Sequence, residues 1–455
     1  MRRFSFPVRM LHFATFCCCL GAPNAALAFA DGPRLLKAGP MLGHTTEAET
    51  VIWLQTTEPA EVRISYHKDG ERQASSVASQ TTAELYLTAK IRLTGLEPGS
   101  AYSYEILLNG EILAFPYRLA FTTQPIWRYR TDPPDIRFAV GSCLYVNDPP
   151  FDRPGEPYGG DYQILGHIRG AQPHFMIWTG DNTYLREGDF TPTRMDYRYR
   201  HTRALAELQP LLAGTVHYAT WDDHDFGPNN SNRNYPFKGE ALRLFNAYWT
   251  NPHAGTDEVR GVFCKWSWSD VDFFLLDDRY HRAPNESADP DKPFFGAGQL
   301  AWLKDALVSS DASFKLVVSG NQVLNRYSPH EGFANYRREY RELMDWLDAS
   351  KVAGVVFISG DRHFTELLKE RRAGNYGLYE FTCSPLTSGT IGRLGDEADN
   401  PLRVPGTLLS ENRNFALLTV KGTPGERELH IQVIDANGAP RWEYTIPRKE
   451  LEPPN

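Results

Sequence analysis

Ile136-Arg137-Phe138-Ala139-Val140, followed at once by Gly141-Ser142-Cys143, is the stretch of sequence that decides the fold. It is an apolar run that ends in small and reactive side chains. Five further runs end in polar side chains in the same way, and they lie at residues 175–184, 217–225, 273–282, 316–322 and 355–363. In open α/β sheets, ligands bind beyond the carboxyl ends of the strands. Because these runs carry Asp, Asn, His, Arg and Cys to that position, we expect a metal site at one edge of a sheet.

Each of these runs has a simpler explanation when it is taken alone. A single Gly-Asp after a strand is often a turn in which the Asp caps the next helix. The segment Asp222-Asp223-His224-Asp225 is compatible with a solvated acidic loop, and His363 with a purely structural hydrogen bond. The six runs together are much harder to explain as turns, so they favour a shared site.

The length and the charge of the chain limit its class. At 455 residues it is longer than one typical domain, which predicts two. Its formal net charge of -8 argues against a nucleic acid as specific partner, because such binding relies on a basic surface. An acidic protein that binds a phosphate ester needs local cations, and metal ions are the obvious source.

The first 30 residues predict an export signal. Arg2 and Arg3 form a basic start, residues 10–20 are moderately apolar, and Ala26-Leu27-Ala28 is a small-x-small cleavage site. The same arginines are compatible with a twin-arginine signal or with an ordinary Sec signal. No later segment is long and apolar enough to span a bilayer, so we expect a periplasmic or extracellular protein without stable membrane insertion.

Removal of this signal leaves three cysteines, Cys143, Cys264 and Cys383. An odd number in an oxidising compartment leaves at least one thiol unpaired, either as a ligand or as a buried inert residue. Disulfide bonds therefore do not define this fold.

The chain divides into two regions of different pattern. Residues 32–125 alternate apolar and polar side chains, which predicts an all-β, fibronectin-like sandwich with a structural role. After a proline-rich linker, residues 135–448 alternate strands with helical stretches, among them 298–307 and 340–349. The fold class predicted is therefore α/β, a sheet sandwich flanked by helices, preceded by the β domain.

The order of the motifs resembles a known family. The motifs are Gly-Ser-Cys (141–143), Gly-Asp-x-x-Tyr (180–184), Trp-Asp-Asp-His-Asp (221–225) with an Asn pair at 229–230, Asp-x-Arg-x-x-Arg (277–282) and Ser-Gly-Asp-x-His (359–363). Over about residues 35 to 440 this is similar to the PhoD-like branch of the calcineurin-type metallophosphoesterases. The pair Asn182-Thr183 is as similar to purple acid phosphatases as to PhoD.

The resemblance implies a ligand set and its metals. Family members carry Fe³⁺ with Ca²⁺, and other divalent metals are alternatives. The family's metal ligands fall on Cys143, Asp181, Tyr184, Asp361, His363 and one of Asn229 and Asn230, of which position favours Asn229.

The chemistry of these side chains is consistent with that set. A tyrosine with an ordinary pKa near 10 forms a phenolate at neutral pH only beside a strong Lewis acid such as Fe³⁺. A thiolate at Cys143 also suits iron better than Ca²⁺ or Mg²⁺. The alternatives are a packed aromatic ring for Tyr184 and a small buried apolar side chain for Cys143.

The function predicted is hydrolysis of phosphate monoesters by a metal-activated hydroxide or oxide, and the sequence leaves open whether diesters are substrates as well. His224 is expected to protonate the leaving group or to orient a ligand, and Arg279 to clamp the phosphate or to pair with Asp277 or Asp278. Two rival functions are a phospholipase C-like phosphodiesterase and a non-catalytic exported binding protein on a degenerate scaffold. The sequence leaves the oligomeric state open.

Overall fold

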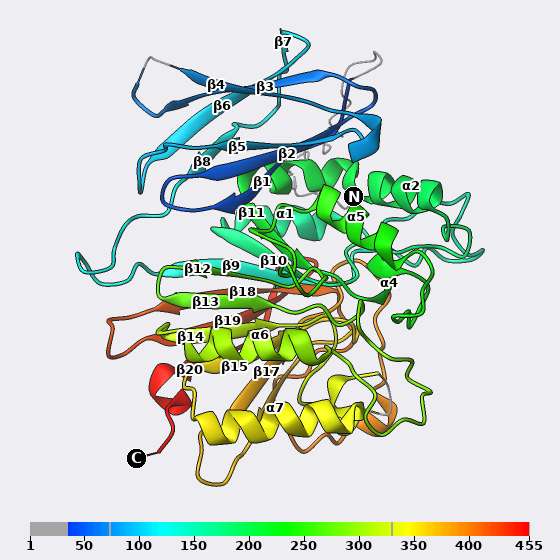
Figure 1. Ribbon diagram of the computed structural model, residues 1–455, viewed down its shortest axis with the longest axis vertical. Helices are drawn as coiled ribbons and strands as arrows, with labels where there is room; N and C mark the ends of the chain where they lie inside the picture. The colour runs from blue at the N-terminus through cyan, green and yellow to red at the C-terminus, as the bar shows by residue number, and fades with distance from the viewer. Residues whose placement is uncertain (1–34, 72–73, 329–330, 455) are drawn as a thin grey trace, which may run out of the picture. The chain divides into compact units, whose positions relative to one another are not determined.

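The computed structural model describes residues 35–71, 74–328 and 331–454 (Figure 1). The predicted export signal at 1–30 lies outside the described residues. Among the helices of the described part, none combines the length and the apolar character that a membrane crossing requires. Cys143, Cys264 and Cys383 are all buried, and each is a free thiol.

Two large mixed sheets form the centre of the described region. The nine-stranded sheet has the order β20 (Pro440–Pro447), β19 (Glu428–Asp435), β18 (Asn414–Lys421), β9 (Ile136–Gly141), β10 (Phe175–Thr179), β11 (Val216–Thr220), β1 (Leu36–Thr45), β2 (Thr50–Thr56) and β5 (Thr88–Leu93). The six-stranded sheet has the order β12 (Cys264–Trp268), β13 (Val271–Leu275), β14 (Phe314–Val318), β15 (Val355–Ser359), β17 (Leu378–Thr382) and β16 (Glu366–Glu370).

These two sheets pack face to face through aromatic side chains. Phe138 of β9 stacks on Phe175 of β10 with ring centroids 5.0 Å apart, and both rings meet the edge of Phe273 from β13 at 5.3 and 5.2 Å. Each such pair stabilises the interface by about 0.5–1.5 kcal/mol beyond the burial of its area. In both sheets the central strands are parallel and buried along their whole length, as expected for strands covered on both faces.

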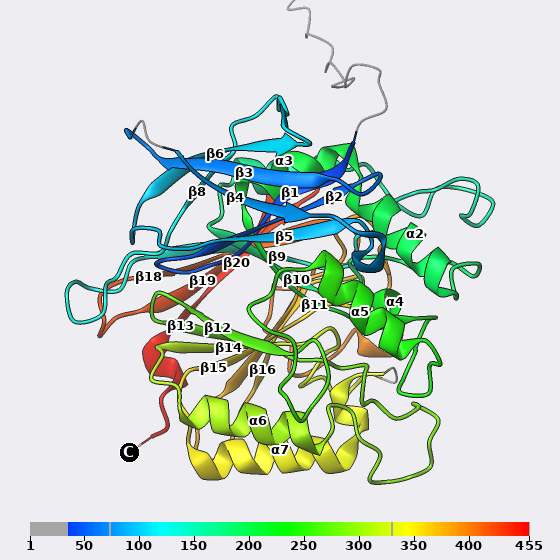
Figure 2. The same cartoon turned by 45° about the horizontal axis from the view of Figure 1, so that its top comes forward.

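Helices cover the outer faces of the two sheets (Figure 2). α6 (Ala297–Val308) and α7 (Arg337–Ser350) lie side by side along the six-stranded sheet and bury Leu303, Leu307, Leu343 and Leu347 against it. The other face of the nine-stranded sheet is covered by α1 (Gln163–Gly170), α3 (Gln209–Gly214) and α5 (Lys238–Tyr248). Within the described ranges, the remaining helices are α2 (Pro192–Arg203), the short α4 (Asp223–Phe226) and five single 3₁₀ turns at Ala83–Leu85, Ala206–Leu208, Phe333–Asn335, Gly395–Glu397 and Arg448–Leu451.

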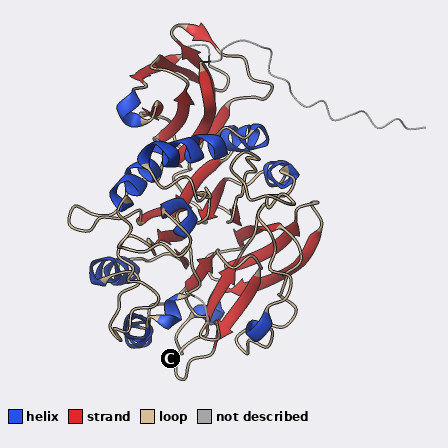
Figure 3. Cartoon of the chain, turned by 90° about the vertical axis from the view of Figure 1, so that its right-hand side faces the viewer, coloured by secondary structure: helices blue, strands red, loops and turns tan. Residues whose placement is uncertain are grey.

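The N-terminal β region forms the group of strands at the top of Figure 3. Its third sheet has the order β4 (Ser75–Gln80), β3 (Glu61–Lys68), β6 (Ala101–Leu108) and β7 (Glu111–Ile112), with β8 (Ala120–Thr122) also on β6. This sheet shares an apolar core with β1, β2 and β5, as in a sandwich. However, β1 also pairs in parallel with β11, at Leu42 and Val216, so half of the sandwich continues the large sheet. The domain boundaries 32–125 and 135–448 stay a prediction.

The predicted fold class is confirmed, and one part of the prediction is wrong. All six apolar runs become strands, namely β9, β10, β11, β13, β14 and β15, and the stretches 298–307 and 340–349 are helical. The runs do not share one sheet edge, because β9 to β11 belong to one sheet and β13 to β15 to the other. Since the sheets pack face to face, two sets of strand ends supply the site.

A buried arginine fixes the opposite end of this sandwich. Arg427, at the start of β19, is 1% exposed. Its Nε and Nη2 donate to the carboxylate of Asp270, in the turn between β12 and β13, at 3.0 and 2.5 Å, and its Nη1 donates to Asp135 at 3.0 Å. The ion pair therefore joins the nine-stranded sheet to the six-stranded sheet.

Replacing this arginine should destabilise the fold. We expect Arg427→Met to lower the free energy of unfolding by about 3–5 kcal/mol, because Asp270 is left charged and buried without a partner. Arg92 is the control, since its ion pair with Glu49 is half exposed and should contribute at most about 1 kcal/mol. Urea unfolding of both variants measures the difference, and equal losses would contradict the role given to Arg427.

Candidate metal centre

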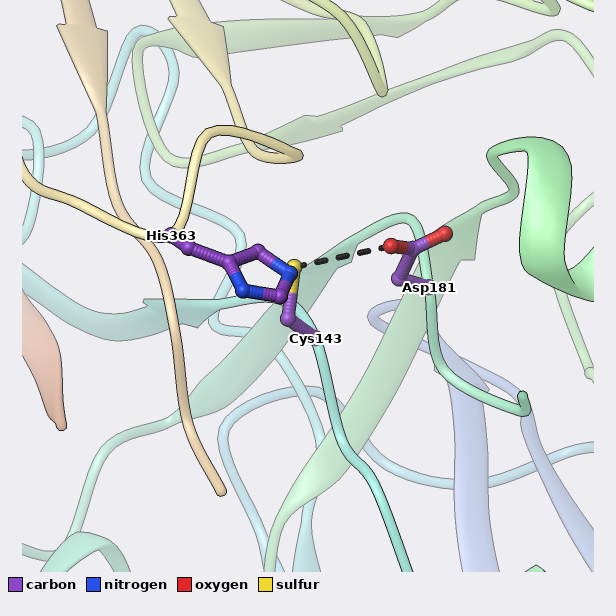
Figure 4. A group of neighbouring side chains, drawn as sticks. All are labelled: Cys143, Asp181 and His363. Carbon is purple, nitrogen blue, oxygen red and sulfur yellow. Dashed lines mark hydrogen bonds between the residues drawn. The ribbon is translucent and has the colours of Figure 1, made fainter. Parts of the chain in front are cut away.

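Two groups of metal-ligating side chains lie at the carboxyl ends of the strands. Cys143, Asp181 and His363 form one group, and ligand atoms of all three lie within 4.8 Å of one another (Figure 4). Asp181, Asp223 and His224 form the other, within the same limit. Asp181 belongs to both groups, so its carboxylate is placed to bridge two cations.

The backbone at these positions adopts a conformation that side chains usually avoid. Cys143, Asp181, Asp361 and His363 have φ values of 60, 53, 66 and 56°, in the left-handed region. Outside glycine this conformation costs of order 1–3 kcal/mol per residue, and such positions cluster at functional sites. The turns that follow β9, β10 and β15 therefore store strain in order to aim these side chains inward.

Two glycines allow the strand ends to approach closely. A Cβ on Gly360 would lie 2.4 Å from the carbonyl oxygen of Thr179, at the end of β10 in the other sheet. A Cβ on Gly180, which has a φ of 90°, would lie 2.6 Å from the Cβ of Asp222. The backbone that precedes Asp361 thus passes directly over the backbone that precedes Asp181.

Cys143 receives hydrogen bonds that suit a thiolate. Ser384 donates to its Sγ at 3.1 Å, and Ser142 at 3.5 Å. Burial nevertheless raises the pKa of the Cys143 thiol to about 11. A cation next to the sulfur is therefore needed to hold it as a thiolate at neutral pH.

Tyr184 lies between the two histidines. Its hydroxyl is 3.2 Å from Nε2 of His363, and its ring stacks on His224 with centroids 4.3 Å apart. Burial first, and then the charges of Asp181 and Cys143, raise the pKa of Tyr184 well above its ordinary value. Burial lowers the pKa of both His224 and His363, which keeps the imidazoles neutral and able to bind a metal.

The carboxylates of the centre lack sufficient positive partners. Burial and the nearby Asp223 raise the pKa of Asp181 well above its ordinary value, and burial with Glu331 raises that of Asp361 to about 7. In addition, Nδ1 of His224 is buried and has no hydrogen-bond partner among the residues that the structure describes. Crowded acids next to an unpartnered imidazole nitrogen are what a cation site requires, so these residues fit a bound metal.

Asp223 is the ligand candidate that the sequence analysis did not single out. It belongs to the second group, and its carboxylate accepts the backbone N–H of Asn230 at 2.6 Å. Burial alone would raise its pKa, but the neighbouring His224, the charge of Arg279 and the N–H of Asn230 together outweigh burial and hold the pKa below its usual range. The Trp-Asp-Asp-His-Asp motif contained the signal, although it did not show which acid faces the centre. Asn229 and Asn230 are both exposed and line the cavity beside it, so the choice between them stays open.

Arg279 does not lie in the cavity. It is fully buried, donates from Nη1 to Glu331 at 2.9 Å and forms a close ion pair with Asp222. Its role as a phosphate clamp stays a prediction, and this geometry favours the structural alternative. Of the two partners expected, Asp278 lies within ion-pair distance at 3.8 Å, but the closest partner is Asp222, which the sequence analysis did not name.

The centre opens into a polar cavity of about 580 Å³. Asp181, Asp223, His224, Asp361 and His363 line one part of it. The other lining residues are mostly polar, and they are Tyr158, Asn229, Asn230, Asn285, Glu286, Lys292, Glu331, Asn335, Tyr336 and Arg362. A larger hollow of about 730 Å³ beside α5 contains none of the ligand candidates.

Comparison with known families identifies the class of the protein. Residues 138–431 match the model of the PhoD-like phosphatase family, which is more than half of the chain. The chain belongs to the PhoD-like phosphatase family. Membership places it among hydrolases of the phosphoesterase class. Residues 33–126 match a separate domain of unknown function.

Individual relatives of this PhoD-like chain are distant. Alkaline phosphatase D of Bacillus subtilis (strain 168) is 21% identical over 383 residues, which are 70% of this chain and 61% of the relative. The chain thus spans less than two thirds of that relative. The solved structure of PhoD superposes with a TM-score of 0.73 at 16% identity, covering 92% of this chain and 93% of its own. Purple acid phosphatase PPD1 from yellow lupin (Lupinus luteus) superposes with a TM-score of 0.62 at 12% identity, covering 90% of this chain and 74% of its own. Both structures show the shared fold.

The close contact at Gly360 can be tested by adding one methyl group. We expect Gly360→Ala to lower the free energy of unfolding by about 1–3 kcal/mol, because the Cβ would overlap the backbone of Thr179. The control is Gly166→Ala in α1, where a Cβ meets nothing within 4 Å and should stabilise the helix by about 0.5–1 kcal/mol. Thermal unfolding distinguishes the two, and a Gly360→Ala protein as stable as the original would refute the close approach.

Proposed function

We propose that this chain is an exported, metal-dependent phosphatase that hydrolyses phosphate monoesters and, in addition, diesters. The observation that carries the proposal is the pair of ligand groups that share Asp181 on the wall of a polar cavity. A shared carboxylate between two cation positions is typical of two-metal phosphoesterases. The family membership supports the same reaction class.

The residues divide between the two cation positions by their chemistry. Cys143, Tyr184, His363 and Asp181 offer the sulfur, phenolate and imidazole ligands that suit Fe³⁺. Asp361, Asp223, His224 and one of Asn229 and Asn230 add mainly oxygen ligands around Asp181, which suit Ca²⁺ or another divalent ion. Bound cations would neutralise the phosphoryl oxygens and make a nucleophile of water at neutral pH.

The chain itself supplies position and counter-charge. His224 is held by the ring of Tyr184. As a neutral imidazole it serves as a ligand, and only as an imidazolium would it protonate the leaving alkoxide. Arg362 and Lys292 line the cavity and offset the charge of an entering phosphate ester. The polar walls favour a hydrophilic alcohol as the leaving group.

Two further points belong to this proposal. The basic start and the cleavage site within residues 1–30 support export to the periplasm or beyond, by the twin-arginine or the Sec route. A cavity of about 580 Å³ is larger than a phosphoryl group needs, which favours diesters, including those of a phospholipase C-like reaction, as second substrates. The nearly complete ligand set argues against a non-catalytic binding protein.

Removing the shared carboxylate should remove both metals and the activity. Asn is the best replacement at Asp181, because Asn tolerates the left-handed backbone there. We expect Asp181→Asn to lower phosphatase turnover by at least about 100-fold, since both cations lose a ligand. Elemental analysis and turnover of a phosphate monoester measure the effect, with the exposed Asp257→Asn as the control. Retained metal and activity would exclude Asp181 as the bridge.

The role of Tyr184 as an iron ligand can be tested by the colour of the purified protein. If its phenolate binds ferric iron, the purified protein should absorb visible light through charge transfer from the ring to the metal. Tyr184→Phe keeps the ring that packs on His224 and Tyr145 and loses only the hydroxyl. We expect this variant to lose the band. A coloured Tyr184→Phe protein, or an iron-free original with full activity, would remove Tyr184 from the ligand set.

A further inference from the structure

Tyr158 reaches the candidate metal centre from a loop that no sequence motif marked. It lies between β9 and α1, and its side chain lines the cavity although the residue is 44% exposed. Its hydroxyl is 3.1 Å from Nδ1 of His363. The same imidazole has its Nε2 3.2 Å from the hydroxyl of Tyr184. His363 is therefore held between two phenols, one on each ring nitrogen.

The backbone around Tyr158 is fixed to the segment that follows β17. Gly160 donates its N–H to the carbonyl of Thr387 at 2.7 Å. Arg413 donates from Nε to the carbonyl of Ser388 at 2.8 Å and from Nη2 to the carbonyl of Tyr158 at 3.3 Å. Asn147 exchanges two hydrogen bonds with the backbone of Gly159, at 2.8 and 2.9 Å. An exposed loop residue held by this many contacts has a defined position.

The ring of Tyr158 is fixed as well. Its edge meets the ring of Tyr145, with centroids 4.9 Å apart and planes at 77°. Gly389 packs against the ring, and a Cβ there would lie 2.7 Å from Cε2 of Tyr158. These contacts leave the hydroxyl directed at His363.

The consequence concerns the tautomer of His363. A histidine that binds a metal through one nitrogen carries its proton on the other, and an acceptor for that proton fixes the ring and strengthens the ligand. Nε2 of His363 lies against the hydroxyl of Tyr184, and the ring of Tyr184 stacks on His224 of the second ligand group. Nε2 is therefore the ring nitrogen on the side of the metal centre, and Nδ1 must carry the proton. We propose that Tyr158 is a positioning residue, whose hydroxyl oxygen accepts the Nδ1 proton of His363 and so presents Nε2 to the metal. This inference rests on the proposed function, because it assigns a partner to one of its ligands.

The chain offers a matched control for this hydroxyl. Tyr145 belongs to the same ring cluster, but its hydroxyl donates to Asp152 at 2.8 Å rather than to His363. Tyr158→Phe and Tyr145→Phe therefore each remove one hydroxyl and keep one ring. The backbone of Gly389 also accepts a hydrogen bond from His363, so the loss in Tyr158→Phe should be partial.

The experiment has a metal-dependent and a metal-free part. Iron dissociation is measured by competition with a chelator in the full-length protein, and we expect Tyr158→Phe to bind iron about 10-fold more weakly while Tyr145→Phe matches the original. In the metal-free protein, long-range ¹H–¹⁵N spectra of labelled histidines, with His363→Gln for assignment, report the tautomer. We expect the Nδ1–H form in the original and a mixture in Tyr158→Phe, with unchanged thermal unfolding.

The outcomes separate this inference from the proposed function. Equal iron affinity in Tyr158→Phe and the original, or equal weakening in Tyr145→Phe, would overturn it while leaving the metal site intact. An Nε2–H tautomer in the metal-free original would overturn it too. A protein that binds no metal would instead overturn the proposed function, and the spectra would still decide whether Tyr158 sets the tautomer.

Discussion

The structure depends on holding several buried acids together where two sheets end. Asp181, Asp223 and Asp361 are brought together by β10, α4 and β15, which belong to different layers of the molecule. Like charges at this distance in a low-dielectric site repel one another strongly. The aromatic packing between β9, β10 and β13 and the ion pair of Arg427 with Asp270 supply the rigidity that keeps them there. The two packed sheets therefore hold these three acids close together against their mutual repulsion.

The two sheets also hold the strained backbone of the site in place. Four of the ligand candidates occupy left-handed conformations, three of them two residues after the end of a strand and His363 four residues after the end of β15. A parallel strand with neighbours on both sides cannot rotate to relieve the strain of the turn that follows it. The sheets therefore hold the strained backbone in place. As a result, each of these side chains is preorganised toward the centre before any ligand binds.

Sequence patterns predicted the strands and the ligands to a useful degree, and the failures have physical causes. The apolar runs identified all six strands, because burial on both faces leaves a continuous apolar signature. They could not show that the strands form two sheets, since pairing partners leave no trace in periodicity. In the motif at 221–225, Asp222 contacts Arg279 directly, whereas Asp223 lies 3.9 Å from that arginine and belongs to a ligand group, a difference that depends on the turn into α4. Tyr158 escaped notice because its role comes from loop contacts that are distant in sequence.

The distribution of counter-charges explains why some acids of this region are structural and others are reserved for metals. Arg279 and Arg282 are fully buried and pair with Asp222 and Glu331, so these two acids are neutralised by the protein itself. Asp181 has no Lys or Arg within ion-pair distance among the described residues, and the only such partner of Asp361 is Arg362 at 3.8 Å. Burying a carboxylate without a cation is too costly to persist in a folded protein unless a ligand compensates it. Asp223 lies 3.9 Å from Arg279 and so shares that arginine with Asp222. Asp181 is therefore the acid of the centre that depends most on a metal for neutralisation.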